Sequence, residues 1–296
     1  MLVIFNPTAG RRRRSRLDRV LAELAAAGAA VELRPTAHAG DAEAIAAAAA
    51  PPADGLIVAA GGDGTLAEVV NGLIANPARD AFRLGLIPLG TANVLAHEIG
   101  LPEDAAGIAR VLLAGAPRTV HPGRIRRDGA PDRHFLMMAG AGFDAAVVAA
   151  VTPRLKRLLG KGAYVWQTLR RAAAGRSPEL AVSADGAEFA AQSVVACNGR
   201  RYGGPYVLAP AADLSEPWLQ VVLLARAGGW RVFPQGLRLM LGRLAAAPEV
   251  RLTSARRIAV SGVGCLQADG DAAGPLPVTI EATDVPLSLM TPRRDS

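Results

Sequence analysis

Residues 56–74 read LIVAAGGDGTLAEVVNGLI, and this segment determines how the first part of the chain folds. Its first five residues are apolar without interruption, which is typical of a strand that is buried on both faces. From Leu66 onward, apolar residues recur at the three- and four-residue spacing of a helix. The glycine-rich residues 61–65 are therefore predicted to join a buried strand to a helix.

Residues 61–65, Gly-Gly-Asp-Gly-Thr, have the composition of a phosphate-binding turn. Glycines permit positive φ angles and let the backbone approach a ligand without a Cβ clash. The N–H groups and the positive dipole end of the following helix attract phosphate. The carboxylate of Asp63 fits beside phosphates chiefly if Mg²⁺ or a ligand hydroxyl lies between them. Gly and Asp also favour turns, so an ordinary strand-to-helix turn is the alternative interpretation.

The chain has 296 residues, of which 51% are hydrophobic and 20% are charged, enough for one large or two medium domains. It contains no uninterrupted apolar run of about twenty residues and does not open on a secretory signal. We therefore expect a soluble, cytoplasmic protein. The two cysteines, Cys197 and Cys265, form no C-x-x-C pair, which argues against a structural zinc site or a disulfide framework.

The formal net charge is +7, and arginines occur in runs along the whole chain. Such charge suits nucleic acid, an anionic membrane surface or phosphorylated ligands. Only 4% of the residues are aromatic and no nucleic-acid-binding motif occurs, so nucleic acid is not an expected partner. Several basic residues on one face would give peripheral, reversible binding to an anionic membrane surface.

Strands and helices alternate over the first part of the chain. Strands are expected at residues 2–5, 31–34, 56–60 and 83–88, each followed by a helical segment. This alternation predicts a parallel, three-layer α/β domain, in which ligands bind beyond the carboxyl ends of the strands. The loops at that edge are 6–10, the loop at Thr36, 61–65 and 90–93.

After about residue 122 the pattern changes to short, closely spaced strands, which predicts an antiparallel β-sandwich or barrel. The expected strands are 134–139, 179–183, 189–197, 218–224, 249–253, 257–261, 276–281 and 285–290. Helices are expected at 154–174 and 230–244. The predicted domains are 1–122 and 123–296, with a return of the last residues to the first domain as an alternative.

Asp269-Gly270-Asp271 is the most informative motif of the second half. Asp-Gly is well suited to a type I′ hairpin turn, which is one interpretation. The other is that a carboxylate here takes a proton from an attacking hydroxyl, since phosphoryl transfer needs positioning, charge neutralisation and such a base. Residues 140–145 fit the G-x-G-x-x-A dinucleotide pattern only weakly, because no acidic residue follows about twenty positions later.

Taken in order along the chain, several motifs resemble the diacylglycerol kinase catalytic family, in its soluble bacterial, YegS-like lipid kinase branch. These motifs are Asn6–Gly10 (NPTAG), Gly61–Thr65 (GGDGT), Glu68–Gly72 (EVVNG), Gly90–Asn93 (GTAN), Gly142–Asp144 (GFD) and Asp269–Asp271 (DGD). The glycine motif is shared with NAD kinases and phosphofructokinases, whereas the Asn-Pro and C-terminal motifs favour the lipid branch. The resemblance implies an NAD kinase- and phosphofructokinase-like α/β nucleotide-binding domain, followed by a β-sandwich lipid-substrate domain, with the active site in the cleft between them.

The same resemblance implies ATP and Mg²⁺ as cofactors. The implied ATP-binding residues are Asn6, Thr36, Gly61, Gly62, Asp63, Gly64, Thr65, Leu66, Ala67, Thr91, Asn93 and Lys161. Asp63 is expected near the phosphates and the catalytic Mg²⁺. The base is expected from Asp269 or Asp271, and the choice stays open because the family usually has Glu at the second of these positions.

Two departures from the family pattern stand out. Val94 occupies a position where many relatives have Asp, so one charge of the usual network is missing. The family's structural Mg²⁺ loop has the form Leu-x-Asp-Asp-Gly-x-Leu, and residues 213–219 correspond to it as DLSEPWL. Asp213, Glu216 and the carbonyl of Trp218 are the candidate ligands there.

The expected function is that of an ATP- and Mg²⁺-dependent lipid kinase, which phosphorylates a hydroxyl of a diacylglycerol-like or phospholipid substrate at a membrane surface. One alternative is a kinase for a soluble acceptor, of the NAD kinase type. The other is a lipid- or nucleotide-binding regulator whose catalytic site has decayed. A homodimer is left open as the assembly.

Overall fold

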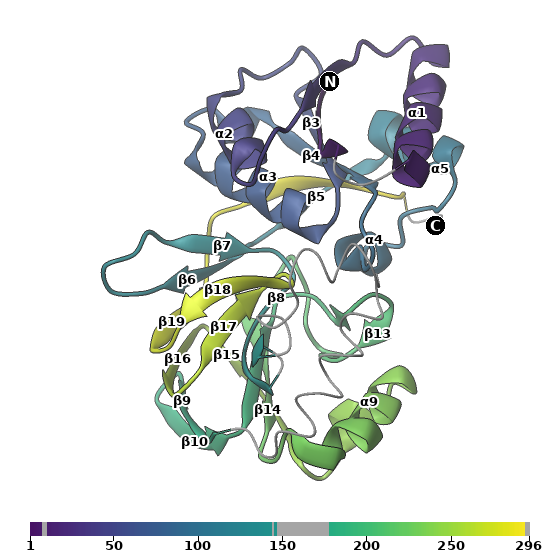
Figure 1. Cartoon of the computed structure of the whole chain (residues 1–296). Coiled ribbons are helices and arrows are strands. Elements are labelled where there is room, and N and C mark those ends of the chain that lie inside the picture. Colours follow the sequence, from purple (N-terminus) through teal and green to yellow (C-terminus); the bar gives the residue numbers. More distant parts are fainter. Residues whose placement is uncertain (8–10, 144, 147–177, 294–296) are drawn as a thin grey trace. The chain divides into compact units, whose positions relative to one another are not determined.

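The computed structural model describes residues 1–7, 11–143, 145–146 and 178–293. It divides into two compact units, which we describe separately (Figure 1). Unit 1 comprises Met1–His121 and Val285–Ser296, and unit 2 comprises Pro122–Asp284. The helix expected at 154–174 and the candidate ATP ligand Lys161 lie outside the described residues.

Unit 1 contains one mixed sheet with the strand order β2-β1-β3-β4-β20-β5. Its strands are β1 (Leu2–Phe5), β2 (Glu32–Pro35), β3 (Leu56–Gly61), β4 (Arg83–Pro88), β5 (Ala116–Val120) and β20 (Leu287–Thr291). The first five in the spatial order are parallel, and β5 is antiparallel to β20. Every residue of β3 is buried, as its unbroken apolar sequence predicts for a central strand.

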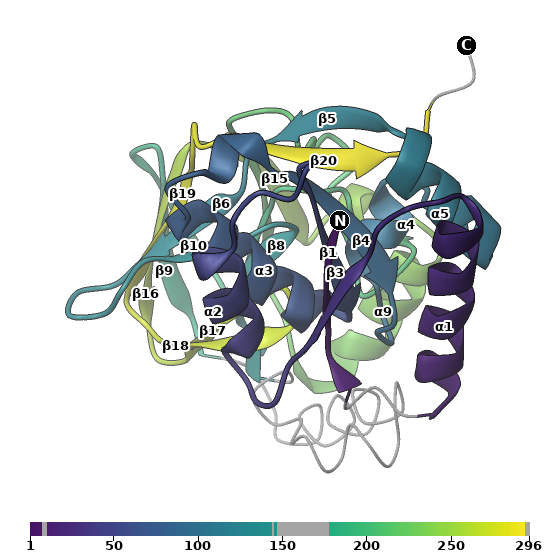
Figure 2. The same ribbon diagram turned by 90° about the horizontal axis from the view of Figure 1, so that it is seen from above.

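Helices cover both faces of this sheet. They are α1 (Arg11–Ala26), α2 (Asp41–Ala48), α3 (Asp63–Ala75), the short η2 (Arg79–Ala81), α4 (Val94–Glu98) and α5 (Ala105–Ala114). Figures 1 and 2 show α2 and α3 on one side of the sheet and α1 and α5 on the other. The predicted three-layer α/β arrangement is therefore confirmed, and the carboxyl ends of β1 to β4 lie at one edge.

The end of the chain belongs to the sheet of unit 1. The strand expected at 285–290 is β20, which lies between β4 and β5. The strand β5 was not predicted, because its sequence APRTV has no clear apolar alternation and contains Pro117. It forms an edge of the sheet, where the missing N–H of a proline is tolerated.

Unit 2 contains two antiparallel six-stranded sheets, which confirms the predicted β-rich second half. One has the order β10-β9-β16-β19-β6-β7 and the other the order β15-β14-β11-β8-β17-β18. The strands of the first are β6 (Gly123–Arg126), β7 (Arg133–Phe135), β9 (Leu180–Ala184), β10 (Ala187–Ala191), β16 (Arg257–Gly262) and β19 (Val278–Ala282). Those of the second are β8 (Met138–Gly142), β11 (Ser193–Cys197), β14 (Leu219–Leu224), β15 (Val250–Ala255), β17 (Cys265–Ala268) and β18 (Asp271–Pro275). The short strands β12 (Arg201–Tyr202) and β13 (Tyr206–Val207) pair with each other.

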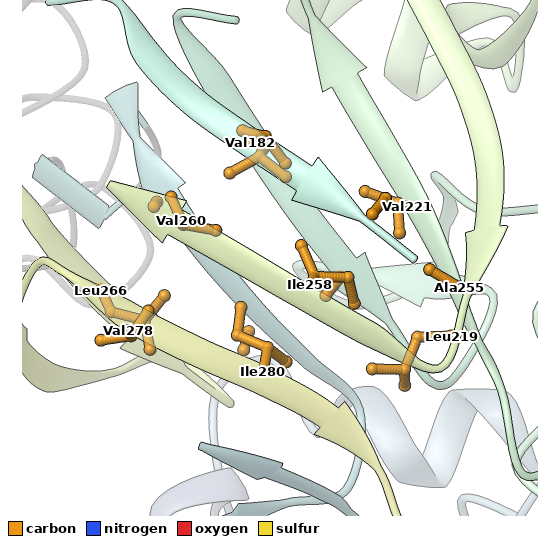
Figure 3. Packing of buried hydrophobic residues seen from close by; sticks show 14 of the residues in the cluster. Val182, Leu219, Val221, Ala255, Ile258, Val260, Leu266, Val278 and Ile280 are labelled. Atoms are coloured by element: carbon orange, nitrogen blue, oxygen red, sulfur yellow. The ribbon is translucent and has the colours of Figure 1, made fainter. Parts of the chain in front are cut away.

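The two sheets share a core of aliphatic side chains. Val182, Ile258 and Ile280 extend from one sheet, and Val221 and Leu266 extend from the other (Figure 3). All five belong to one buried cluster. Complete burial of such a side chain stabilises the fold by about 1.5–3 kcal/mol relative to exposure, so the sandwich gives the hairpins on its edges a rigid base.

Two of the expected strands are each divided in the structure. The segment 134–139 forms β7 and β8, because the N–H groups of Leu136 and Met137 between them bind the carboxylate of Asp269 instead of a neighbouring strand. The segment 189–197 forms β10 and β11, which belong to different sheets and are separated at Gln192. The apolar run Phe135–Ala139 gives no sign of the first break, whereas the polar pair Gln192-Ser193 marks the place of the second.

The helix expected at 230–244 is shorter than predicted. It consists of η3 (Gly229–Arg231), α9 (Val232–Met240) and η4 (Leu244–Ala246). Gly242 has φ 66°, a left-handed conformation that ends helices. No helix among the described residues is long and apolar enough to cross a membrane.

Candidate functional site

The turn between β3 and α3 begins the candidate nucleotide site of unit 1. β3 ends at Gly61, and α3 begins at Asp63 after the N-cap residue Gly62. The first hydrogen bond of the helix runs from the N–H of Leu66 to the carbonyl of Gly62, at 3.1 Å. The N–H groups of Gly64 and Thr65 precede it and have no acceptor within the helix, which is the arrangement that binds anions.

The glycines of this turn are required for close packing. Gly62 has φ −93°, and no described residue of the 61–65 turn has a positive φ angle, so the turn does not use the positive φ angles that glycine permits. A Cβ on Gly61 would lie 2.4 Å from the Thr65 hydroxyl oxygen. A Cβ on Gly90 would lie 2.6 Å from the Cα of Gly62. The turn and the loop 90–93 therefore pack backbone against backbone.

Asp63 binds the 90–93 loop through both carboxylate oxygens. Its Oδ2 accepts a hydrogen bond from the N–H of Asn93 at 3.0 Å, and its Oδ1 accepts one from the N–H of Val94 at 2.8 Å. The carboxylate thus lies at the N-terminus of α4, where the helix dipole favours a negative charge.

Asn93 closes its own loop in a left-handed conformation. It has φ 47° and ψ 52°, which asparagine adopts more readily than most residues. Its Oδ1 accepts a hydrogen bond from the N–H of Gly90 at 2.7 Å, and its Nδ2 donates to the carbonyl of Gly90 at 3.2 Å. Asn93 therefore sets the shape of the loop that carries Thr91.

Asn6 and Thr36 join the same edge of the sheet. The N–H of Asn6 donates to the carbonyl of Ala60 at 3.1 Å, and its Nδ2 donates to the Thr65 hydroxyl at 3.4 Å. The N–H of Thr36 donates to the carbonyl of Phe5 at 2.8 Å. The structure thus links Asn6 to the 61–65 turn and places Thr36 beside the end of β1 within unit 1.

Leu66 and Ala67 fit a more limited role than the other implied ATP ligands. Both side chains are buried on the inner face of α3. Only their backbone atoms are therefore placed to contact a nucleotide.

Two carboxylates without a predicted role hold the loop that carries Thr36. The two carboxylate oxygens of Glu68 accept hydrogen bonds from the N–H groups of Gly40 at 3.0 Å and Ala42 at 3.2 Å. Asp41 accepts from Ala37 at 2.6 Å and from His38 at 3.1 Å. The hydrogen bond from Ala37 and, to a lesser extent, that from His38 lower the pKa of Asp41 below its usual value. An acidic residue in the first turn of a helix was the available sequence signal for Asp41.

In unit 2, Asp269-Gly270 forms the turn of the β17–β18 hairpin. Asp269 has φ 48° and Gly270 has φ 84°, as a type I′ turn requires. The N–H of Gly270 donates to the side-chain oxygen of the buried Gln267 at 2.9 Å. The interpretation of this motif as a hairpin turn is therefore confirmed.

The carboxylate of Asp269 is occupied by backbone N–H groups. Its Oδ2 accepts a hydrogen bond from Leu136 at 2.7 Å, and its Oδ1 accepts from Met137 at 2.9 Å and Met138 at 3.0 Å. The N–H of Asp269 in turn donates to the carbonyl of Met138 at 3.0 Å. Asp269 therefore fastens the hairpin to the segment between β7 and β8.

Asp271 differs from Asp269 in its surroundings. It is the first residue of β18 and is partly exposed. Its side chain forms no hydrogen bond or ion pair with any residue in the described part of the chain. The hairpin thus presents the Asp271 carboxylate on a support that Asp269 fixes.

The candidate metal loop at 213–219 forms a hydrogen-bonded turn. The Oδ1 of Asp213 accepts from the N–H of Ser215 at 2.9 Å and from its hydroxyl at 2.6 Å. The N–H of Glu216 donates to the carbonyl of Asp213 at 3.0 Å. Across the described residues, no three His, Cys, Asp or Glu side chains gather as metal ligands. The metal role of Asp213, Glu216 and Trp218 stays a prediction.

Comparison with known proteins agrees with the sequence resemblance. Residues 1–125 match the diacylglycerol kinase catalytic domain, and residues 137–291 match the YegS C-terminal NAD kinase beta sandwich-like domain. The chain therefore belongs to the diacylglycerol kinase catalytic domain family, with the two-part organisation of the YegS-like lipid kinases.

Individual relatives support this assignment, and a solved structure shows the same fold. The chain is 31% identical over 281 residues to the "Diacylglycerol kinase" of Bacillus subtilis, covering 93% of this chain and 90% of the relative. It is 35% identical over 206 residues to a "Probable lipid kinase YegS-like" of Pseudomonas putida, covering 68% and 66%. A diacylglycerol kinase crystal structure from Bacillus anthracis superimposes with a TM-score of 0.74 at 24% identity, covering 98% and 96%, which shows the shared fold.

The contrast between Asp269 and Asp271 predicts different effects on stability. Asp269→Ala leaves buried backbone donors without their acceptor, and each such loss costs about 1–3 kcal/mol. We therefore expect a drop of at least ~2 kcal/mol in the free energy of unfolding, measured by urea denaturation followed by circular dichroism. The matched control Asp271→Ala should change it by less than ~0.5 kcal/mol. Equal losses in both variants would contradict this assignment.

Proposed function

We propose that this lipid kinase transfers the γ-phosphate of ATP, in the presence of Mg²⁺, to a hydroxyl of a diacylglycerol-like or phospholipid substrate. The observation that carries the proposal is the Asp63 carboxylate, which joins the glycine turn to the 90–93 loop at the start of two helices. A helix N-terminus supplies N–H groups and a positive dipole end for phosphates. The family assignment supports a kinase, and this geometry supports ATP as the donor.

The ATP phosphates are proposed to bind along the edge formed by residues 61–65 and 90–93. The N–H groups of Gly64 and Thr65 are oriented for phosphate oxygens by their place at the start of α3. Asn6 orients the Thr65 hydroxyl from the neighbouring strand end. Thr36 and Thr91, on the adjoining loops, are proposed to contact the rest of the nucleotide. Lys161 is proposed as a further ATP ligand on the basis of the sequence alone.

The residues of unit 1 fit Mg²⁺. This ion usually binds through one or two carboxylates together with substrate phosphates and water. Asp63 supplies such a carboxylate, and its two N–H donors fix the side chain in place. Bound Mg²⁺ would neutralise charge on the phosphates of ATP.

Asp271 is proposed as the general base. It takes the proton from the acceptor hydroxyl as the hydroxyl oxygen forms a bond to the γ-phosphorus, and the bond from phosphorus to the bridging oxygen of ADP breaks. Asp269 cannot accept this proton without weakening its bonds to Leu136, Met137 and Met138. Its proposed role is to hold the hairpin that carries Asp271.

The acceptor is proposed to be a membrane lipid, which the protein reaches by peripheral, reversible binding to an anionic surface. The net charge of +7 supports this binding. A soluble acceptor of the NAD kinase type is the second candidate, because residues 137–291 match a domain that is described as NAD kinase beta sandwich-like.

A direct test is transfer of labelled γ-phosphate from ATP and Mg²⁺ to lipids in anionic vesicles, with NAD as the soluble control. The panel should contain diacylglycerol, phosphatidylglycerol, ceramide and a sphingoid base. We expect a labelled lipid product that disappears when Mg²⁺ is chelated. Labelling of NAD alone would move the chain to the soluble-acceptor class. Tight ATP binding without any labelled product would instead indicate a decayed catalytic site.

Removal of either proposed catalytic carboxylate should strongly reduce turnover without unfolding the protein. Asp271→Asn removes the base, and Asp63→Asn removes the charge beside the phosphates. Asp271→Asn should lower kcat at least about a hundredfold, within the ~10²–10⁴-fold range of general acid–base catalysis. Asp63→Asn should also lower kcat at least about a hundredfold, because it removes electrostatic stabilisation of the phosphates. Asp128→Asn, at an exposed position between β6 and β7, is the matched control and should keep full activity. Turnover like that of the wild type in both variants would refute the assigned roles.

A further inference from the structure

The helix α9 of unit 2 has an exposed apolar surface. Its exposed large apolar side chains, together with those directly before and after it, are Trp230 (75%) in η3, Phe233 (43%), Leu237 (58%) and Met240 (63%) in α9, and Leu241 (60%) just beyond. We call these residues the α9 surface. Figure 1 shows α9 outside the two packed sheets of unit 2, so this surface is not part of the sandwich core.

The α9 surface is one continuous stripe along the helix. At about 100° of rotation per residue, its members fall within a sector of roughly 100°. The opposite side faces the protein, where the buried Gln235 donates from its Nε2 to the carbonyl of Arg226 at 2.8 Å. A surface helix normally turns its apolar stripe toward the core, so α9 has the reverse orientation. An apolar stripe held outward indicates an interaction site.

The aromatic residues at the start of the stripe are held together. The rings of Trp230 and Phe233 stack with centroids 5.7 Å apart and an interplanar angle of 23°. Trp is enriched at the boundary between membrane and water, because its ring is apolar and its N–H is polar.

The charged residues within the segment that carries the stripe are all basic. Residues 225–248 contain Arg226, Arg231, Arg238 and Arg243 and no acidic residue. Arg238 binds Glu249 at 2.6 Å, just beyond this segment. Arg226, Arg231 and Arg243 are exposed. An anionic lipid surface offers negative headgroups directly beside an apolar layer, which matches this combination of side chains.

We propose that the α9 surface inserts into the interface of an anionic lipid bilayer, with Arg231 and Arg243 contacting the headgroups. The inference rests on the proposed function in one respect, namely that the acceptor lipid lies in such a bilayer. It goes further by assigning membrane binding to one helix of unit 2 and by requiring insertion of apolar side chains in addition to charge attraction.

Vesicle flotation without ATP tests the apolar contribution. The full chain is mixed with vesicles of phosphatidylcholine and phosphatidylglycerol, and the bound fraction gives a partition coefficient. The double variant Trp230→Ser/Leu237→Ser should reduce this coefficient at least about tenfold, because buried apolar area drives interfacial binding. The matched control Leu113→Ser/Val263→Ser removes apolar side chains with 44% and 77% exposure elsewhere, and it should bind like the wild type.

The same assay tests the charged contribution. Arg231→Gln/Arg243→Gln should weaken binding about tenfold to anionic vesicles and little to vesicles of phosphatidylcholine alone. Arg110→Gln, an exposed arginine of α5 in unit 1, is the control. Binding of the α9 variants equal to that of the wild type on anionic vesicles would overturn the proposal.

Activity separates this proposal from the proposed function. The α9 variants should retain turnover on a short-chain diacylglycerol dispersed in water and lose it on long-chain lipid in vesicles. If no lipid is phosphorylated by the wild type but flotation still depends on the α9 surface, membrane binding stands and the proposed function fails. If Trp230→Ser/Leu237→Ser instead converts an oligomer to a monomer with vesicle binding unchanged, the surface joins copies of the chain, and the proposal is overturned.

Discussion

The hydrogen bonds from Asn93 and Val94 to Asp63 are the constraint on which the site of unit 1 depends. They hold two strand-to-helix connections so close together that a Cβ on Gly90 would lie 2.6 Å from the Cα of Gly62. Two helix N-termini are thereby fixed at the same edge of the sheet. The carboxylate that identifies the motif in the sequence is thus also the residue that assembles the backbone proposed to bind phosphate.

A similar arrangement recurs in unit 2 with a second aspartate. Asp269 binds the N–H groups between β7 and β8, and this attachment fixes the hairpin on which Asp271 lies. In both units a carboxylate that accepts backbone hydrogen bonds gives a loop one defined conformation. Catalysis by positioning requires such preorganisation, because groups that are already in place need not reorganise during the reaction.

The sequence predicted the alternating α/β half, the antiparallel β half and the residues of unit 1 that gather at one edge. These features follow from local apolar periodicity and from motifs. It did not distinguish Asp269 from Asp271, because the donors that occupy Asp269 come from residues about 130 positions earlier in the chain. The same bonds divide the strand expected at 134–139. Long-range hydrogen bonds of this kind leave no local pattern in the sequence. The outward orientation of the apolar stripe of α9 leaves none either.

Calorimetric titration of ATP and Mg²⁺ into Gly90→Ala tests the central claim most directly. A Cβ at this position would meet the backbone of Gly62 at 2.6 Å and force the two loops apart. The matched control is Gly236→Ala in α9, where a Cβ meets nothing within 4 Å. We predict that ATP affinity falls at least about tenfold in Gly90→Ala, equivalent to ~1.4 kcal/mol, and is unchanged in Gly236→Ala. ATP binding by Gly90→Ala as tight as in the wild type would contradict a phosphate site built on the contact between these loops.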